Sequence, residues 1–236
     1  MNINDVTIIT GASRGIGRGL AIRFAREKNK IMLFGRDADA LATTKNGLSN
    51  YAVENEIFAG DVSDKDFVKK SVDKILDKFG RVDHLINNAG TRTFNKVIDA
   101  SLDEFKKQID ANLYGIFNFT KACLPSMIER KSGSIINIIS LAGKNSFVTG
   151  SMYSASKHAA LGFTKSLMLE VREYNIRVAA VCPGSVDTQF FGGTDMKPNR
   201  EKILKVEDIA ETVMAILKLP PHALISEIDI RPTNPK

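Results

Sequence analysis

The chain alternates between short, nearly continuous apolar runs and longer segments in which apolar residues recur every three or four positions. A continuous run rich in Val and Ile predicts a strand covered on both faces, whereas the wider spacing predicts an amphipathic helix. In the segment 64–79, for example, Val68, Val72 and Ile75 fall on one helical face. The runs that predict strands are 6–10, 30–34, 53–58, 84–88, 134–140, 177–181 and 223–230.

Strands that alternate with helices along a whole chain predict an α/β fold, because a helix is the usual crossover between parallel strands. We therefore expect a single-domain Rossmann-type, doubly wound parallel sheet of seven strands over residues 1–236, with helices on both faces. No repeat, low-complexity tract or Pro/Gly/Ser-rich linker marks a boundary. Ser101, with Glu104 three positions later, predicts a capping box at a helix start.

Composition narrows the classes of partner. The net charge of +6 is spread along the chain, and basic pairs at 69–70 and 106–107 stand among acidic residues, which predicts solvated helix faces and no nucleic-acid site. Cys123 and Cys182 lie in apolar surroundings outside any metal-like spacing, so we expect reduced, buried thiols and no metal site. No apolar run approaches the ~20 residues of a membrane span. With a strand predicted from residue 6, there is no room for a signal peptide, and the sequence predicts a soluble, cytoplasmic protein.

The first strand is followed by a glycine-rich turn, "TGASRGIG" at 10–17. Gly11, Gly15 and Gly17 stand where a strand passes into a helix, and glycines there let the backbone approach a pyrophosphate closely. The free N–H groups of the helix start favour the phosphate charge. A glycine triplet alone is weak evidence because turns are rich in glycine, but the strand–turn–helix context predicts a dinucleotide site.

The end of the second strand bears on the choice of coenzyme. A carboxylate there would bind the ribose 2′-hydroxyl of NAD, whereas an arginine favours the 2′-phosphate of NADP. The sequence reads "FGRDAD", so Gly35 ends the strand and Arg36 follows it, with Arg14 available from the glycine turn. Asp37 is interpreted as the N-cap of the next helix. These residues predict NADP(H), with NAD(H) as the alternative.

Further motifs follow in order along the chain: "DV" at 61–62, "NNAG" at 87–90, Asn112 in "ANLYG", Ser140 in "NIIS", Tyr153 and Lys157 as Y-x-x-x-K, and "PGSVDT" at 183–188. Together with the glycine turn, they make the chain resemble the short-chain dehydrogenase/reductase family over nearly its full length. The pattern is most similar to the 3-oxoacyl-acyl-carrier-protein reductase-like members. The resemblance implies an oxidoreductase that moves a hydride between a nicotinamide and a ketone or secondary alcohol.

The resemblance also assigns the coenzyme contacts. Asp61 and Val62 would hold the adenine, Asn88 would hold its ribose, and 183–188 would surround the nicotinamide. "NNAG" on its own would equally suit a plain strand-ending turn. The full implied set is Gly11, Ser13, Arg14, Gly15, Ile16, Gly17, Arg36, Asp61, Val62, Asn88, Ala89, Gly90, Tyr153, Lys157, Pro183, Gly184, Val186 and Thr188.

Hydride transfer to a ketone places negative charge on its oxygen, which must be held and protonated. A free tyrosine titrates near ~10, so it is a poor acid–base group at neutral pH unless a nearby cation lowers its pKa. Tyr153 and Lys157 stand one helical turn apart and supply that pair, although such a pair alone is typical of an exposed helix surface. Ser140 would orient the substrate oxygen. By resemblance, Asn112 would kink its helix and hold a water that links Lys157 to solvent.

The substrate is less well determined. The active-site segment 140–157 is followed by a short substrate lid at 189–205, which favours an open pocket for a 3-oxoacyl thioester or another small-to-medium carbonyl compound. The expected apolar wall consists of Phe94, Thr149, Met152, Phe190 and Phe191.

Two other functions remain open at this stage. A non-catalytic dinucleotide-sensing or scaffolding protein could keep the same fold, and a nucleotide-sugar epimerase or dehydratase could share Y-x-x-x-K in a longer chain. The resemblance implies a homodimer or homotetramer through helices at 101–131 and 153–173. The last strand lacks the Gly-Gly common in the family, which puts contacts through the C-terminal tail in doubt.

Overall fold

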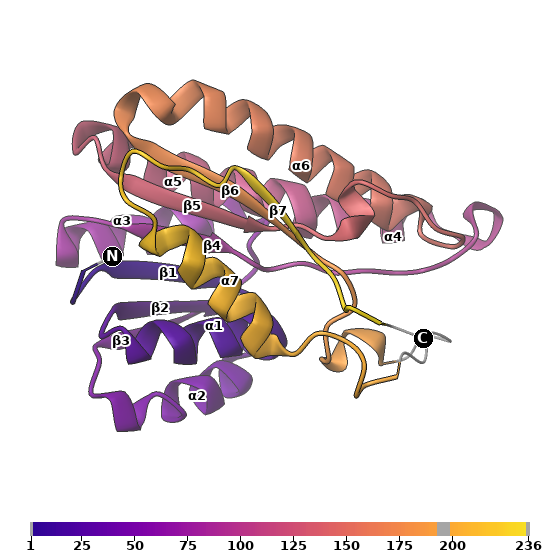
Figure 1. The fold of residues 1–236 in the computed structure, drawn as a ribbon, viewed down its shortest axis with the longest axis horizontal. Coiled ribbons are helices and arrows are strands. Elements are labelled where there is room, and N and C mark those ends of the chain that lie inside the picture. Colours follow the sequence, from indigo (N-terminus) through magenta and orange to yellow (C-terminus); the bar gives the residue numbers. More distant parts are fainter. Residues whose placement is uncertain (1, 193–198, 235–236) are drawn as a thin grey trace.

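Seven strands form one parallel sheet in the computed structural model, which describes residues 2–192 and 199–234 (Figure 1). Their order across the sheet is β3-β2-β1-β4-β5-β6-β7, so the predicted doubly wound α/β fold is confirmed. The strands are β1 (Val6–Thr10), β2 (Lys30–Gly35), β3 (Asn55–Ala59), β4 (His84–Asn87), β5 (Gly133–Ile138), β6 (Ile176–Pro183) and β7 (Glu227–Ile230).

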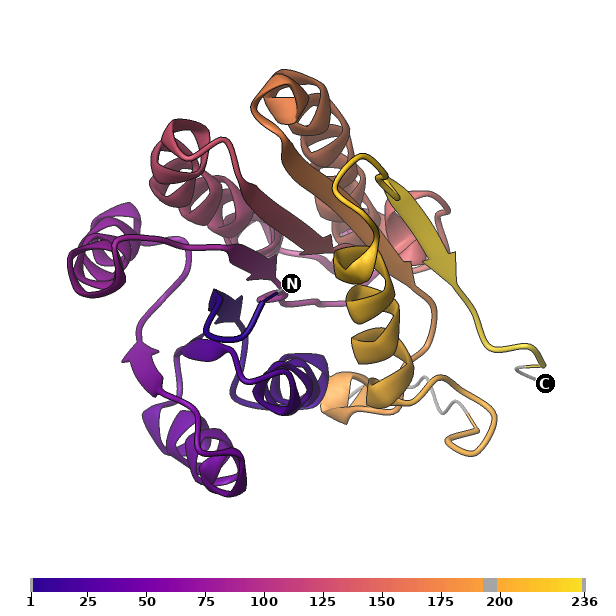
Figure 2. The ribbon, with the colours of Figure 1, turned by 60° about the vertical axis from the view of Figure 1, so that its left-hand side comes forward.

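Helices cover both faces of this sheet, as Figure 2 shows in a view along it. Helices α1, α2 and α7 lie on one face, and α3, α5 and α6 lie on the other. The bounds are α1 (Gly15–Arg26), α2 (Ala38–Asn46), α3 (Lys65–Phe79), α4 (Leu102–Ile109), α5 (Gly115–Glu129), α6 (Ser151–Val171) and α7 (Val206–Lys218).

The continuous apolar runs are explained by this arrangement. Ile8 and Ile9 are neighbours on β1 and both are fully buried, yet their side chains belong to cores on opposite faces of the sheet. Ile9 packs in the core that includes Phe24 of α1, whereas Ile8 packs in the core that includes Phe119 of α5. A strand covered twice needs apolar side chains at successive positions, which is why the runs do not alternate with polar residues.

Most local signals are confirmed. Ser101 and Glu104 form both hydrogen bonds of a capping box at the start of α4, and the Asp37 side chain accepts from the Ala40 N–H at the start of α2. The expected strand over 223–230 is too long, because β7 contains only its second half. The residues between α7 and β7 form a connection through Pro220. Within it, the Ser226 carbonyl accepts a hydrogen bond from the Ala180 N–H of β6.

The sheet reverses its winding between β1 and β4. Strand β1 pairs with β2 on one side and with β4 on the other, so the chain adds β2 and β3 on one side of β1 and then crosses over to add β4 to β7 on the other. In such sheets the carboxyl ends of the strands on either side of this switch point border a crevice for ligands. The glycine turn follows β1, and "NNAG" overlaps the end of β4 and continues beyond it. Both motifs therefore lie at the expected crevice.

Candidate active site

The glycine turn has the backbone form that the motif predicts. Gly11 has φ of +64°, where a side chain would be strained, and a Cβ there would lie 2.8 Å from Cα of Ala89. A Cβ on Gly17 would collide with the carbonyl oxygen of Gly11. Arg14, which precedes α1, makes no side-chain cap, so the helix start keeps its N–H groups for another acceptor. This cradle suits a pyrophosphate.

Thr10 fastens the glycine turn to the segment after β4. Its hydroxyl oxygen accepts from the backbone N–H groups of Asn88 and Ala89, both at 2.9 Å. The Asn88 amide donates in turn to the carbonyls of Thr10 and Gly11 at 3.0 and 3.2 Å. The sequence analysis missed Thr10, although a hydroxyl residue at the carboxyl end of a strand next to the turn was a usable signal.

Two exposed arginines flank the expected adenosine end of the crevice. Arg36 directly follows β2. Burial works to raise the pKa of the Asp61 carboxyl, yet that pKa lies below its ordinary value, and the charge of Arg36 is the smallest of the causes that lower it. Hydrogen bonds from the backbone and hydroxyl of Ser63 also lower that pKa. Within the described residues, neither Arg14 nor Arg36 has a carboxylate in an ion pair. Both cations remain available for an anionic ligand, because Asp37 is used as a cap.

Asn112 lies in a single turn of π-helix, Asp110–Tyr114, between α4 and α5. The fully buried amide accepts from the Thr91 N–H at 2.8 Å and donates to the Thr91 carbonyl and the Ser156 hydroxyl at 2.9 Å. A local kink in this helix was expected, and π-turns often occur at functional sites. A Cβ on Gly90 would lie 2.8 Å from Asn112 Oδ1 and 3.6 Å from Lys157 Nζ, so "NNAG", Asn112 and Lys157 meet.

Tyr153 and Lys157 both lie on the buried side of α6. Lys157 Nζ donates to the Ile138 carbonyl at 3.2 Å and lies 5.9 Å from the centre of the Tyr153 ring. Tyr153 and Lys157 are therefore not an exposed pair on the helix surface. Burial lowers the pKa of Lys157 to about 8, because no carboxylate of the described residues forms an ion pair with it and the nearby Cys182 opposes the effect only in part.

The expected direction for Tyr153 is wrong in the protein alone. Burial raises the pKa of Tyr153 to about 12, and a hydrogen bond with Ser140 and the charge of Arg92 only partly oppose it. Lys157 was expected to dominate, but its ammonium faces the end of β5 and is not among these influences. Ser140 lies two residues beyond β5, where its hydroxyl caps a short 3-10 turn by accepting from the Ala142 N–H.

The "PGSVDT" segment at 183–188 closes the crevice from the side of β6. A Cβ on Gly15 would lie 3.3 Å from Thr188 Cγ2, which brings this segment against the glycine turn. Its path is fixed by backbone hydrogen bonds between Ser185, Asp187 and Leu204. Asp187 also forms ion pairs with Arg200 and Lys205. The segment therefore stands where it could cover a nicotinamide.

Aromatic rings surround the Tyr153 phenol ring. The Phe94 ring lies 5.5 Å from it and the Phe190 ring 5.9 Å, between ring centres, so two residues of the expected wall do contact the tyrosine. Phe147, which the sequence did not single out, stacks edge-on against Phe94 at 5.3 Å. Thr149 adopts φ of +69°, a strained form for a β-branched residue, just before α6.

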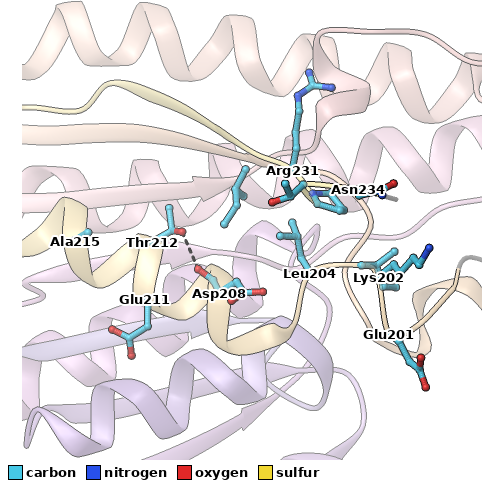
Figure 3. A pocket seen from close by; sticks show the side chains of 13 residues that line it. Glu201, Lys202, Leu204, Asp208, Glu211, Thr212, Ala215, Arg231 and Asn234 are labelled. Atoms are coloured by element: carbon cyan, nitrogen blue, oxygen red, sulfur yellow. Dashed lines mark hydrogen bonds between the residues drawn. The ribbon is translucent and has the colours of Figure 1, made fainter. Parts of the chain in front are cut away.

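The expected substrate lid at 189–205 is described only in part, and its last residues line a hollow apart from the predicted catalytic residues. Residues 193–198 of the expected lid, and the side chain of Phe191, lie outside the described part of the chain. The last residues of that lid line an open hollow of about 700 Å³ between α7 and the residues after β7 (Figure 3). Thr212 and Asp208 of α7 form one side of it, and Arg231 and Asn234 form the other. The hollow contains none of the predicted catalytic or coenzyme residues.

No helix of the described residues is long and apolar enough to cross a membrane. Within the same residues, no group of three His, Cys, Asp or Glu side chains is placed to hold a metal ion. Both cysteines are buried and unpaired, as expected.

Comparison with known proteins agrees with this geometry. An uncharacterized oxidoreductase of Staphylococcus saprophyticus is 36% identical over 230 residues, which cover 97% of each chain. An alcohol dehydrogenase from the archaeon Thermococcus sibiricus, solved with 5-hydroxy-NADP, is 33% identical with a TM-score of 0.89 and 97% of each chain covered. A metagenomic short-chain oxidoreductase solved with NADP is 33% identical with a TM-score of 0.87 and 98% of each chain covered. The family model described as short chain dehydrogenase matches residues 5–198, and the chain belongs to that family.

Proposed function

We propose that this protein is an NADP(H)-dependent oxidoreductase that interconverts a ketone and a secondary alcohol, with Tyr153 as the general acid and base. The observation that supports it most is the meeting of Tyr153, Lys157 and Asn112 beside the glycine cradle. A buried phenol and a buried lysine without a counter-ion are costly to fold, which is typical of groups kept for chemistry.

The coenzyme would be held by the residues that the sequence analysis assigns to it. The glycine turn and the start of α1 suit the pyrophosphate, Asp61 and Val62 the adenine, and 183–188 the nicotinamide. When bound, NADPH supplies the hydride. Its 2′-phosphate would face Arg36 and Arg14, two cations that no carboxylate neutralises among the described residues. The two related structures that contain NADP or its 5-hydroxy derivative favour the same coenzyme.

We propose a proton path through Ser140, Tyr153, Lys157 and Asn112. The Ser140 hydroxyl would hold the substrate oxygen, and the Tyr153 hydroxyl would give it a proton as negative charge develops. Lys157, whose pKa is about 8, would stabilise the phenolate that remains, give up a proton to restore the phenol, and regain a proton through a water held by Asn112. The pKa of Tyr153 near 12 in the protein alone means that its phenol is protonated at neutral pH, which suits the direction of ketone reduction.

The substrate class is a small-to-medium carbonyl compound, with a 3-oxoacyl thioester as one candidate.

The chain is proposed to act as a homodimer or homotetramer, because Tyr114, Phe117 and Leu169 expose apolar surface around the start of α5 and on α6. Sedimentation analysis tests this assembly, and a monomer at micromolar concentration would contradict it.

Replacement of Tyr153 by Phe tests the reaction. We expect Tyr153→Phe to bind NADPH with the wild-type affinity and to lose ketone reduction by about three orders of magnitude, because the proton donor is removed while the ring packing stays. The assay is a panel of ketones, β-keto esters and acyl thioesters, followed by absorbance of the nicotinamide with both coenzymes. Near wild-type turnover by the variant would contradict the mechanism. NADPH binding without turnover of any panel member by the wild type would favour the alternative, a dinucleotide-sensing or scaffolding protein.

The coenzyme preference has its own variant. Arg36→Ala should weaken NADPH by about tenfold or more and leave NADH within about twofold, because only the 2′-phosphate needs the guanidinium. The measurement is the dissociation constant of each coenzyme by fluorescence titration. Equal losses for the two coenzymes would mean that Arg36 does not contact the 2′-phosphate.

A further inference from the structure

Arg92 occupies an unusual position above the candidate active site. It lies two residues after "NNAG", and its guanidinium stacks over the rings of Phe94 and Phe190, with Cζ at 5.5 and 5.2 Å from their centres. Those are the two rings that contact the Tyr153 ring. The cation and the phenol ring therefore contact the same two rings.

Within the described residues, only part of this guanidinium is hydrogen-bonded. Nε donates to the Phe190 carbonyl at 2.7 Å, and Nη2 donates to the carbonyls of Phe190 and Gly192. Nη1, with its two N–H groups, has no hydrogen-bond partner within residues 2–192 and 199–234. No carboxylate of this part of the chain forms an ion pair with Arg92.

The surroundings of Arg92 increase the effect that an anionic ligand would have on it. The side chain is half-buried, and burial together with the nearby charge of Arg14 lowers its pKa. A cation in such a place gains more from an anion than a fully hydrated one would. The Arg14 guanidinium is itself held toward this side by a contact of 3.5 Å with Gln189. Arg92 is therefore a positive group at the mouth of the site, and no carboxylate within the described residues forms an ion pair with it.

The walls of the mouth are aromatic. Phe147 and Phe190 are each more than a third exposed, although such rings are normally buried, and Phe94 lies between them against Tyr153. Apolar walls with a few oriented polar groups are typical of small-molecule sites. An apolar body resting on these rings would place its ends near Tyr153 and Nη1.

We propose that Arg92 determines substrate specificity by binding the carboxylate of an oxo acid, whose ketone reaches Tyr153 and whose apolar body lies on Phe94, Phe147 and Phe190. This assignment rests on the proposed function and specifies its substrate class. Because the cation and the phenol contact the same two rings, the arrangement favours acids in which a few bonds separate the ketone from the carboxylate. A carboxylate can accept both N–H groups of Nη1 or combine one of them with a bound water.

Matched pairs of acid and ester test the proposal. The substrates are benzoylformate and 3-benzoylpropionate, each compared with its methyl ester, with NADPH as the coenzyme. We expect the wild type to have the higher kcat/KM for the acids. Arg92→Met should lower the acid-to-ester ratio of kcat/KM by about 10- to 100-fold, the range for one hydrogen bond to a charged group. Arg92→Lys should retain part of the preference, because it keeps the charge and loses the planar group.

A control and a binding measurement make the outcome specific. Lys96→Met removes a positive charge from the same loop, where Lys96 is exposed, and should leave the ratio within about twofold. Calorimetry then compares phenylacetate with phenylacetamide on the enzyme saturated with NADP⁺. Wild type should prefer the acid, and Arg92→Met should lose that preference.

Failure of this inference differs from failure of the proposed function. If ketones are reduced but the acid-to-ester ratio is the same in wild type and Arg92→Met, Arg92 only fastens residues 190–192 and the inference is overturned. If no ketone is reduced while the preference for phenylacetate depends on Arg92, the anion site stands and the proposed reaction is wrong.

Discussion

At the amino ends of β1 and β4, buried charges meet opposite charges, whereas at the carboxyl ends of the sheet a buried lysine meets none among the described residues. Asp5 and Asp83 are nearly inaccessible, and both pair with Arg81. Asp83 also accepts from Arg130 and from the Val6 N–H. At the other end, Lys157 donates only to a backbone carbonyl.

We interpret the paired charges at the amino ends as serving stability, and the unpaired buried groups at the carboxyl ends as serving proton transfer. A buried ion pair with further hydrogen bonds is costly to break, because the partner that remains is left without compensation. Hydrogen bonds from His84 and Asn2 keep the pKa of Asp5 low although burial alone would raise it. At the carboxyl ends, burial is compensated only in part, and it shifts the pKa of Lys157 down to about 8 and that of Tyr153 up to about 12. Groups held in this way are prepared to exchange protons with a ligand.

The largest effect that sharpens this comparison is expected at the amino ends. Asp83→Asn should lower the free energy of unfolding by about 2–4 kcal/mol, because the amide cannot accept from Arg81, Arg130 and the Val6 N–H together. Reduction kinetics of the folded variant at 25 °C should stay within about twofold of wild type. Urea unfolding and kcat/KM are the two measurements.

The matched control is Asp73→Asn. Asp73 forms an ion pair with Lys69 one helical turn away, and both side chains are well exposed, at 49% and 72%. Loss of that pair should cost about 0.5 kcal/mol or less. If the two Asp→Asn variants lost equal stability, or if Asp83→Asn lost activity while folded, the division between the two ends of the sheet would be wrong.

The sequence predicted the fold and most motif residues because both depend on short-range information. Strand runs, caps such as Asp37 before α2, and the Tyr153–Lys157 spacing are all visible within a few positions. Family resemblance then supplied the roles. The contact between Arg92 and Phe190 could not be predicted from the sequence. The two residues are 98 positions apart, and only the packing of their loops brings them together.

The direction of the Tyr153 pKa was missed for a related reason. Helical spacing places a lysine one turn from the tyrosine, but it does not say how deeply either group is buried or where the ammonium points. Both groups are buried, and Lys157 points to the Ile138 carbonyl at the end of β5. Loss of hydration therefore outweighs the hydrogen bond with Ser140 and the attraction of Arg92, and this balance is a property of the packed structure.

A smaller effect, of opposite sign for stability, is expected at Lys157. Lys157→Met should raise the free energy of unfolding of the coenzyme-free protein at pH 7 by about 1–3 kcal/mol, while ketone reduction is lost. The folded state holds this lysine with a pKa of about 8 instead of 10.5, so the unfolded chain binds its proton more tightly and the charge opposes folding. Removal of the charge relieves that cost, less the one hydrogen bond to Ile138.

The pH dependence of this gain in stability shows whether the charge of Lys157 is its cause. Between pH 8 and 10.5 the unfolded wild type binds more protons at Lys157 than the folded protein does, so wild-type stability gains from this residue as pH rises. The advantage of Lys157→Met should therefore shrink across that window, as measured by urea unfolding at a series of pH values. Lys70→Met, at an exposed position of α3, should change stability by less than about 0.5 kcal/mol at any pH. A constant advantage for Lys157→Met would assign the gain to packing, and a loss of stability would mean that the lysine is compensated as fully as the charges at the amino ends.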